Sequence, residues 1–356
     1  MNDPLRKIKP AVRAISAYTL PPYRANIKIN QNENPFDVPE PIKEEVARRL
    51  QSRPWSRYSA FVPASLLERL ASFAGWKPEG TLAGNGSNEL IQAVLTVTVA
   101  EKTRVVIPQP TFTLYRQIVT VLGGEAVSIP LTSDFQFDVP ALLSASRTAD
   151  VVVICSPNNP TGCRIDDEDI CRIATEFDGI LVLDEAYHEF SGHSVVRLLD
   201  KLPNLVVLRT FSKAMAMAGL RIGYMLSSPE ITREVHKATL PYNLNFYSAA
   251  AAETACEMFE LLRPGIELII QERERLIRLL ASIKGLEVFP SSANFILIRS
   301  SLEASVLFEE LHKQDILVRD VSRYPMLSRC VRVSVGSPEE NDRLADALSR
   351  LLSDRL

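Results

Sequence analysis

One lysine of this sequence has neighbours that could support covalent chemistry with a carbonyl compound. Lys213 follows the β-branched run from Val206 to Leu208, with Thr210, Ser212 and Arg221 close by. A lysine withdrawn from water has a lowered pKa, so that more of its free amine can form a Schiff base. The hydroxyls and the guanidinium are donors suited to a phosphate dianion. These residues predict a Schiff-base lysine beside an anion site, although a solvated loop lysine is the simpler reading of Lys213 alone.

A turn that contains two glycines offers a second set of donors for the same anion. Residues 84–89 have the sequence GNGSNE and lie directly before a helical pattern that starts near residue 88. The first backbone amides of a helix and of a glycine turn bind anions. Gly86, Ser87 and Asn88 are therefore candidate phosphate ligands. Taken alone, this turn is explained more simply by Ser87 or Asn88 capping the helix.

Two further polar segments follow apolar runs of strand length. Asp184 ends the run 180–183, where a buried carboxylate could pair with a protonated ring nitrogen and keep the ring an electron sink. A helix cap or a metal ligand is the alternative reading of Asp184. The segment SPNNPTG at 156–162 follows the run 151–154 and is at least a tight turn. Both segments lie where a parallel sheet would bring polar groups together.

The apolar pattern of the chain predicts the sheet that would position these residues. Helix-length segments separate most of the strand-like runs at 105–107, 127–129, 151–154, 180–183, 206–208 and 222–226. This alternation is typical of a mostly parallel sheet, which binds ligands at the carboxyl ends of its strands. Helical spacing of apolar residues also occurs at 42–51, 64–74 and 88–99.

The two ends of the chain have different patterns. Turn-forming residues fill the stretch 30–41, which therefore predicts an arm with little regular structure. A long helical pattern at 247–283, broken or bent near Pro264, leads into strands at 286–289, 294–299, 316–319 and 331–335 and helices at 303–313 and 338–352. We expect an N-terminal arm at 1–40 that joins a small domain at 261–356, and a large cofactor-binding domain at 41–260.

The composition excludes several classes of protein. The 356 residues carry 40 Lys and Arg against 43 Asp and Glu, a formal charge of −3 without a basic block, so nucleic acid is not an expected partner. The apolar runs fall well short of the ~20 residues that span a bilayer, and the first residues lack the apolar core of a secretory signal. We expect a cytoplasmic protein with reduced cysteines, no membrane span and no metal site.

Three segments occur in the order found in fold-type-I pyridoxal-phosphate aminotransferases, a family that this chain resembles. They are NNPTG at 158–162, DEAY at 184–187 and SKAMAMAGLRIGY at 212–224. Among the members, the chain looks closest to those that act on histidinol phosphate, through NENP at 32–35, RY at 57–58, GNGSNE at 84–89 and VRVSVG at 331–336. The resemblance runs from about residue 18 to residue 341. It implies an α/β fold with a large domain on a mostly parallel sheet, flanked by helices, and a smaller α/β domain.

The resemblance also implies roles for the matching residues around a pyridoxal 5'-phosphate cofactor. Lys213 would form the Schiff base and shuttle protons, and Asp184 would pair with the pyridine nitrogen. Asn159 and Tyr187 would bond the phenolic oxygen of the ring, and Phe112 would stack on its face. The cofactor phosphate would be held by the residues of the two donor segments, which are Gly86, Ser87, Asn88, Thr210, Ser212 and Arg221.

Further matching residues would bind the substrate or a second subunit. By resemblance, Tyr58 reaches the cofactor phosphate of the neighbouring subunit, which implies a homodimer. Arg332 would bind the anionic group of the substrate, helped by Arg319, Tyr18 and Asn34. Because Arg332 alternates with valines in a strand, it could instead face solvent at a sheet edge.

The expected reaction is a ping-pong exchange of an amino group between histidinol phosphate and 2-oxoglutarate. An aromatic or other amino-acid aminotransferase and a threonine-phosphate decarboxylase would keep the same lysine and are the nearest alternatives. A different class of protein would be a pyridoxal-phosphate-binding regulatory module without turnover. A nicotinamide-dependent dehydrogenase is disfavoured because no G-x-G-x-x-G follows an early strand.

Overall fold

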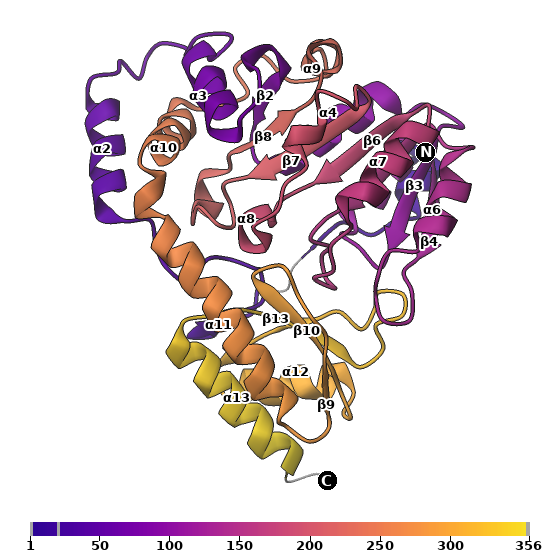
Figure 1. Ribbon diagram of the computed structural model, residues 1–356, viewed down its shortest axis with the longest axis vertical. Helices are drawn as coiled ribbons and strands as arrows, with labels where there is room; N and C mark the ends of the chain where they lie inside the picture. The colour runs from indigo at the N-terminus through magenta and orange to yellow at the C-terminus, as the bar shows by residue number, and fades with distance from the viewer. Residues whose placement is uncertain (1–2, 20–21, 354–356) are drawn as a thin grey trace.

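A seven-stranded and a four-stranded sheet organise the chain in the computed structural model, which describes residues 3–19 and 22–353 (Figure 1). The larger sheet has seven strands in the order β2-β8-β7-β6-β5-β3-β4. Its pairs are parallel apart from the two that β8 makes with β2 and β7. The predicted mostly parallel sheet is therefore confirmed. Its strands are β2 (Thr81–Gly84), β3 (Arg104–Gln109), β4 (Glu125–Pro130), β5 (Val151–Cys155), β6 (Ile180–Asp184), β7 (Leu205–Thr210) and β8 (Gly223–Leu226).

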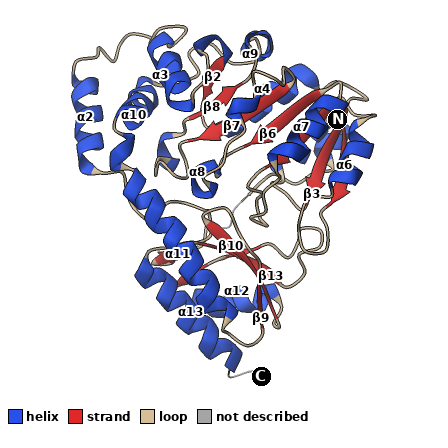
Figure 2. Cartoon of the chain, in the orientation of Figure 1, coloured by secondary structure: helices blue, strands red, loops and turns tan. Residues whose placement is uncertain are grey.

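The central strand β5 is apolar at every position because both faces of the sheet are covered (Figure 2). Successive side chains of a strand point to opposite faces, so Val151 and Val153 pack into one core whereas Val152 and Ile154 pack into another. The first core contains helices α4 (Ser87–Thr98), α5 (Leu114–Leu122) and α9 (Pro229–His236). The second contains α2 (Glu40–Gln51), α3 (Ala64–Ala74), α6 (Val139–Ser146), α7 (Asp167–Glu176) and α10 (Phe246–Glu257).

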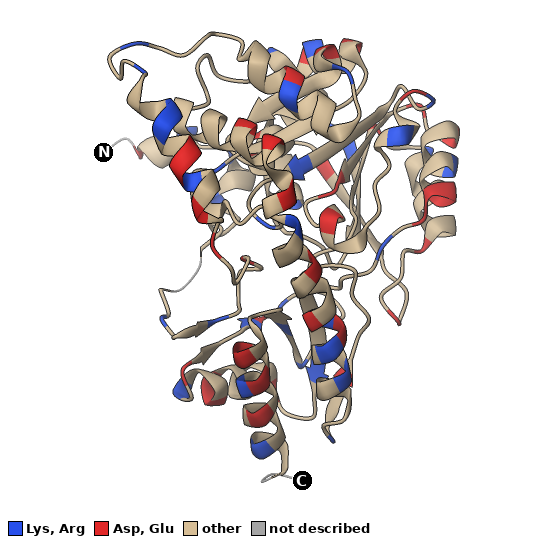
Figure 3. Cartoon of the chain, turned by 60° about the vertical axis from the view of Figure 1, so that its left-hand side comes forward, with Lys and Arg blue, Asp and Glu red and all other residues tan. Residues whose placement is uncertain are grey.

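The smaller sheet has four antiparallel strands and one face covered by helices. Its order is β12-β13-β10-β9. The helix-facing side chains Ile296, Ile298, Val331 and Val333 pack with α11 (Arg263–Ala281), α12 (Ala304–Lys313) and α13 (Pro338–Ser353). Charges of both signs are interspersed on these helices (Figure 3), and Arg275 of α11 pairs with Asp342 of α13. The strands are β9 (Leu286–Val288), β10 (Phe295–Ser300), β12 (Arg319–Asp320) and β13 (Cys330–Ser334).

The helical pattern at 247–283 is interrupted a few residues earlier than its sequence predicted. Helix α10 ends at Glu257 and α11 begins at Arg263, so the stretch is broken and not bent, and Pro264 lies in the first turn of α11. A proline in the first turn removes an N–H that has no partner within the helix. Pro264 therefore starts the helix and does not distort it.

The N-terminal arm is attached to the smaller part of the molecule by strand pairing. Strand β1 (Ile27–Lys28) pairs in parallel with β11 (Ile316–Leu317). Residues 29–39, all of which the structure describes, then form no helix or strand before α2. The strand expected at 316–319 is two short strands, because the chain pairs first with the arm through β11 and then with β13 through β12.

This arrangement supports a division of the chain near residues 40 and 260. The strands of the larger sheet lie between residues 81 and 226, and those of the four-stranded sheet lie between 286 and 334. Helix α11 runs from the larger part to the smaller part (Figure 1). We therefore keep 1–40, 41–260 and 261–356 as our proposal for the arm, the large domain and the small domain; residues 1–2, 20–21 and 354–356 lie outside the described residues. None of the helices in the described ranges is long and apolar enough to cross a membrane.

Candidate active site

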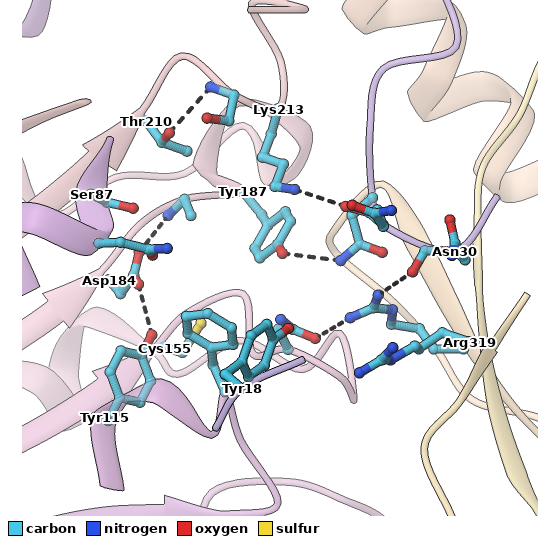
Figure 4. Close-up of a pocket in the computed structure, with 18 of the residues that line it drawn as sticks. Tyr18, Asn30, Ser87, Tyr115, Cys155, Asp184, Tyr187, Thr210, Lys213 and Arg319 are labelled. Carbon is cyan, nitrogen blue, oxygen red and sulfur yellow. Dashed lines mark hydrogen bonds between the residues drawn. The ribbon is translucent and has the colours of Figure 1, made fainter. Parts of the chain in front are cut away.

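A cavity of about 260 Å³ opens at the carboxyl ends of β5, β6 and β7, where the arm and the smaller sheet meet the larger one. It is lined by all of the residues predicted for the site except Gly86, Asn34 and Tyr58. Figure 4 shows Lys213 and Tyr187 between Ser87 and Thr210 on one side and Arg319 on the other. The fold therefore brings together side chains from widely separated parts of the sequence.

Lys213 lies in the loop that follows β7, and its side chain is partly buried. Its Nζ donates a hydrogen bond to the backbone oxygen of Gln31 at 2.9 Å. Burial lowers the pKa of Lys213 to about 7, and the nearby positive charges of Arg332 and Arg221 also lower it. At neutral pH a substantial share of this lysine is therefore the free amine, which is the form that attacks a carbonyl.

Asp184 is the last residue of β6, and only 3% of it is exposed. Its Oδ2 accepts a hydrogen bond from the hydroxyl of Tyr115 at 2.7 Å, and its Oδ1 accepts one from the amide of Ala186 at 3.1 Å. Burial raises the pKa of Asp184 to about 6, against the lowering effect of these two bonds. Asp184 is not a helix cap, because the N-cap of the next helix, α8 (His188–Ser191), is Tyr187.

The predicted anion site is formed by the start of α4 and the loop after β7. Gly86 is the N-cap of α4 and Ser87 its first residue, so the expected cap by Ser87 or Asn88 is wrong. Gly86 has a φ of 77°, and a Cβ there would lie 2.5 Å from a guanidinium nitrogen of Arg221. Arg221 donates to the hydroxyl of Ser212 at 2.9 Å. Because Gly86 has no side chain, the backbone at the start of α4 can lie close to Arg221. Arg221 and Ser212 supply side-chain donors for an anion.

Thr210 completes this donor set, and Gly223 leaves room for it. The hydroxyl oxygen of Thr210 accepts a hydrogen bond from the backbone amide of Ser212 at 3.1 Å. A Cβ at Gly223 would lie 2.5 Å from the backbone nitrogen of Ser87. The approach of β8 to the start of α4 therefore depends on glycine, and the amides at this helix start remain available to an anion.

Three residues lie around the place expected for the cofactor ring. The hydroxyl of Tyr187 accepts a hydrogen bond from Nδ2 of Asn32 at 3.0 Å. Asn159 accepts one from Arg332 at 2.5 Å. Phe112 lines the cavity with its ring edge-on to that of Tyr18, at 6.2 Å between centroids. These side chains could bond an aromatic ring at its oxygen and pack on its face.

The far end of the cavity is positively charged. Arg332 of β13 pairs in register with Arg319 of β12, and both line the cavity together with Tyr18. Because Val331 and Val333 face the helices of the small domain, Arg332 points from the opposite face toward the larger sheet. It is 8% exposed and lies on an inner strand. The alternative that Arg332 faces solvent at a sheet edge is therefore wrong.

Two other predicted residues lie away from the cavity. Asn34 donates to the backbone oxygen of Ala214 at 3.1 Å and lines a neighbouring cavity instead. Tyr58 is 82% exposed and stacks on Tyr242 of the same chain, at 4.4 Å between ring centroids. A direct role for Asn34 or Tyr58 in this subunit's cavity gains no support from their positions.

The sequence interpretation missed several residues that line the cavity. Asn30, Gln31 and Asn32 come from the arm, where the NENP motif drew attention to Asn32 without giving it a role. Tyr115 is the second residue of α5 and lies three residues after Phe112, which precedes the helix. Cys155, the last residue of β5, was assigned only a reduced thiol.

The donor set fits pyridoxal phosphate. Ser87, Thr210, Ser212 and Arg221 form an anion site beside a buried lysine, and a buried carboxylate lies deeper in the same cavity. Nε of Arg332 is buried and has no hydrogen-bond partner among the described residues, as expected of a group that awaits an anion. These residues would hold the phosphate, the aldehyde and the ring nitrogen of the cofactor at separate places.

Comparisons with known proteins agree with this chemistry. Residues 24–348 match the family described as aminotransferase class I and II. The histidinol-phosphate aminotransferase of Chlorobaculum parvum is 39% identical over 345 residues, which cover 96% of this chain and 97% of the relative. A histidinol-phosphate aminotransferase from Sinorhizobium meliloti, solved in complex with pyridoxal-5'-phosphate, has a TM-score of 0.88 to this structure, 26% identity and 98% coverage of both chains. The expected fold class is confirmed.

A solved decarboxylase has a similar fold. The L-threonine-O-3-phosphate decarboxylase from Porphyromonas gingivalis has a TM-score of 0.81 and 23% identity, over 92% of this chain and 99% of that chain. At this identity the likeness concerns the fold alone. The fold by itself therefore does not separate amino transfer from decarboxylation.

Proposed function

The chain belongs to the class I and II aminotransferases, with pyridoxal phosphate as cofactor, and we propose that it transfers the amino group of histidinol phosphate to 2-oxoglutarate in histidine biosynthesis. The observation that carries this proposal is the near full-length similarity to a relative named for that substrate. The two arginines at the far end of the cavity support it, because they would bind a phosphate or a carboxylate. A cytoplasmic location stays a prediction.

When bound, pyridoxal phosphate supplies an electron sink for the bond that breaks at the substrate's Cα. We propose that Lys213 holds the cofactor's aldehyde carbon in the resting enzyme. Nζ of Lys213 would also accept the proton from the substrate's Cα and return it during amino transfer, so that the same group would serve as base and acid. A pKa of about 7 suits a group that must accept and donate protons near neutral pH.

The other proposed roles concern binding and orientation. Asp184 pairs with the ring nitrogen, and its negative charge keeps that nitrogen protonated. Tyr187 and Asn159 donate to the ring's phenolic oxygen, and Phe112 covers one face of the ring. The residues of the anion site fix the phosphate and thereby the position of the whole ring. The residues that form this anion site are Gly86, Ser87, Asn88, Thr210, Ser212 and Arg221.

Histidinol phosphate is expected to convert the bound cofactor to its amine form in a single half-reaction without an acceptor. Glutamate should do the same, whereas phenylalanine and leucine should react far more slowly. Arg332→Gln, which removes the guanidinium group and its charge but keeps a polar amide, should weaken the response to histidinol phosphate by roughly 10- to 100-fold. Stopped-flow absorbance of the holoenzyme measures each rate.

The same experiment distinguishes the alternative reactions. Release of carbon dioxide from threonine phosphate would instead identify a decarboxylase, and a fast reaction with aromatic amino acids alone would identify an aromatic aminotransferase. Either result would contradict the proposed substrate. Absence of any half-reaction from a protein that retains its cofactor would favour the regulatory module.

An exposed aromatic patch supports a homodimer. It consists of Tyr58, Phe61 and Tyr242, which are all exposed and whose rings pack on one another. Large exposed apolar patches on a monomer mark contact surfaces, and the patch includes the residue proposed to reach the neighbouring subunit. We therefore propose that Tyr58 leaves its stacking partner in the isolated chain and binds the cofactor phosphate of a second copy.

Mixing two defective variants tests this role of Tyr58. Tyr58→Phe should weaken cofactor binding by roughly tenfold, because one hydrogen bond to a phosphate is lost, and Lys213→Ala should be inactive. In a mixed dimer, the intact lysine of one chain faces the intact tyrosine of the other, so one wild-type site is restored. Cofactor affinity and turnover are measured after subunit exchange, and light scattering establishes that dimers form.

Trp55→Phe provides the matched control, since it changes an exposed aromatic side chain three residues from Tyr58 without touching the proposed phosphate contact. It should leave cofactor affinity unchanged. If mixed dimers form but regain no activity, Tyr58 does not act across the subunit boundary.

A further inference from the structure

A buried tyrosine contacts the carboxylate proposed to pair with the ring nitrogen. Tyr115 is the second residue of α5, it is 0% exposed, and its hydroxyl donates to Oδ2 of Asp184 at 2.7 Å (Figure 4). We propose that Tyr115 is a positioning residue, whose hydroxyl keeps Asp184 ionised and fixes its direction in the cavity. The effect of this hydrogen bond on catalysis rests on the proposed function. Its effect on the ionisation of Asp184 can be measured without a cofactor.

The surroundings of Asp184 favour the neutral acid unless hydrogen bonds oppose them. Burial is the largest influence, and it raises the pKa of Asp184 to about 6. The titratable groups that face this carboxyl are Tyr115 on α5, Cys155 on β5, Glu185 at the end of β6, and Tyr187. Each of these groups is neutral or negative, so none of them compensates the buried charge. Stabilisation of the carboxylate by these described neighbours therefore comes from hydrogen bonds.

Two donors supply that stabilisation, and Tyr115 is the one that a substitution can remove. The backbone amide of Ala186 binds Oδ1 and would persist in any variant. The hydroxyl of Tyr115 binds Oδ2, and its bond lowers the pKa of Asp184. Burial and the charge of Asp184 raise the pKa of Tyr115 well above its usual value. Tyr115 therefore keeps its proton throughout the working pH range and acts as a donor.

Packing fixes the direction of this donor. The ring of Tyr115 lies in the apolar core between α4, α5 and the larger sheet. The ring of Phe112, which is proposed to cover the cofactor, meets it edge-on at 5.6 Å between centroids. A close-packed ring cannot swing away from Asp184 without displacing its neighbours. The start of α5 thus supports both the face of the cofactor ring and the carboxylate at its nitrogen.

The test removes one hydroxyl and measures the carboxyl directly. In apoenzyme with ¹³Cγ-labelled aspartate, the Asp184 signal is identified by its loss in Asp184→Asn. Tyr115→Phe should raise the pKa of this signal by roughly one to two pH units, because a charge-assisted hydrogen bond is lost. Tyr224→Phe is the matched control. Tyr224 is an equally buried tyrosine whose hydroxyl is 3.3 Å from Arg209, and its loss should leave the Asp184 signal unchanged.

A second measurement follows the consequence in the holoenzyme. With cofactor labelled with ¹⁵N in the ring, Tyr115→Phe should lower the pH at which the ring nitrogen loses its proton. Turnover should fall about tenfold, with the KM values nearly unchanged, because Tyr115 is proposed to act on the reaction through Asp184 and not through the substrate. A purely structural role would change the melting temperature without moving either titration.

Two results would overturn the inference. One is an Asp184 pKa that stays the same in Tyr115→Phe or rises equally in Tyr224→Phe. The other is a ring nitrogen that titrates at the same pH in Tyr115→Phe and in the wild type. Failure of the proposed function would look different. The wild-type enzyme would then not react with histidinol phosphate, but the titrations of Asp184 and of the ring nitrogen could still be compared between the wild type and Tyr115→Phe.

Discussion

Replacing Lys213 with alanine is expected to reduce amino transfer by about 10⁴-fold or more, the scale of a lost general acid and base. The variant lacks both the nitrogen that holds the cofactor's aldehyde and the group that moves the proton at Cα. The anion site of Arg221 and Ser212 is untouched, so non-covalent cofactor binding should persist. Turnover is measured with histidinol phosphate and 2-oxoglutarate.

Covalent attachment supplies an independent measurement for the same variant. Borohydride reduction followed by peptide mass spectrometry should find the cofactor on the peptide that contains Lys213 in the wild type, and on no peptide of Lys213→Ala. Lys237→Ala removes an exposed lysine that pairs with Glu234 and should behave as the wild type. Wild-type turnover by Lys213→Ala would refute the proposed role of this lysine.

Asp184→Asn is expected to lower kcat/KM by roughly 10²- to 10³-fold, the range found when one electrostatic partner of a reacting group is removed. The amide has the shape of the carboxylate, so the contacts with Tyr115 and the amide of Ala186 can be retained in altered form. It has no negative charge with which to keep the ring nitrogen protonated. Steady-state kinetics with the proposed substrates measures the loss.

Two controls distinguish the loss of this charge from a general loss of stability: a modified cofactor and a substitution of the neighbouring carboxylate. A cofactor methylated at the ring nitrogen carries a permanent positive charge, so it should restore part of the lost activity to Asp184→Asn. Glu185→Gln removes the adjacent buried carboxylate, which pairs with Arg209 at 3.0 Å. Its effect should be a lower melting temperature that the methylated cofactor does not reverse. Asp184→Asn with undiminished turnover would contradict the assigned role.

Much of the fold could be predicted because its elements bury continuous or periodic apolar faces. The run 151–154 is apolar at every position since both of its faces are covered, and α3 occupies the same residues, 64–74, that its helical spacing predicted. The sequence order of these strands then predicted that Asp184 and Lys213 would meet at one edge. Arg332 was harder to interpret, because its alternation with valines does not determine which face of the strand is exposed to solvent.

The contacts of the arm with the cavity and the hydrogen bond between Tyr115 and Asp184 could not be predicted in the same way. Gln31 contacts Lys213 through its backbone oxygen, a group that every residue possesses, so its side chain carries no signal. The bond between Tyr115 and Asp184 depends on how α5 is rotated against the sheet, which local spacing does not determine. The sequence left open whether the helical stretch is broken or bent near Pro264, because a proline is compatible both with a bend and with the start of a new helix.

The pairing of β1 with β11 sets an order of events during protein synthesis. Ile27 leaves the ribosome long before its partner Ile316. The strands of the larger sheet all lie between them, so that sheet can assemble while the arm still lacks its partner strand. Gln31 and Asn32 reach Lys213 and Tyr187 only after the arm has docked. The cavity is therefore completed by a contact between two segments that are synthesised far apart in time.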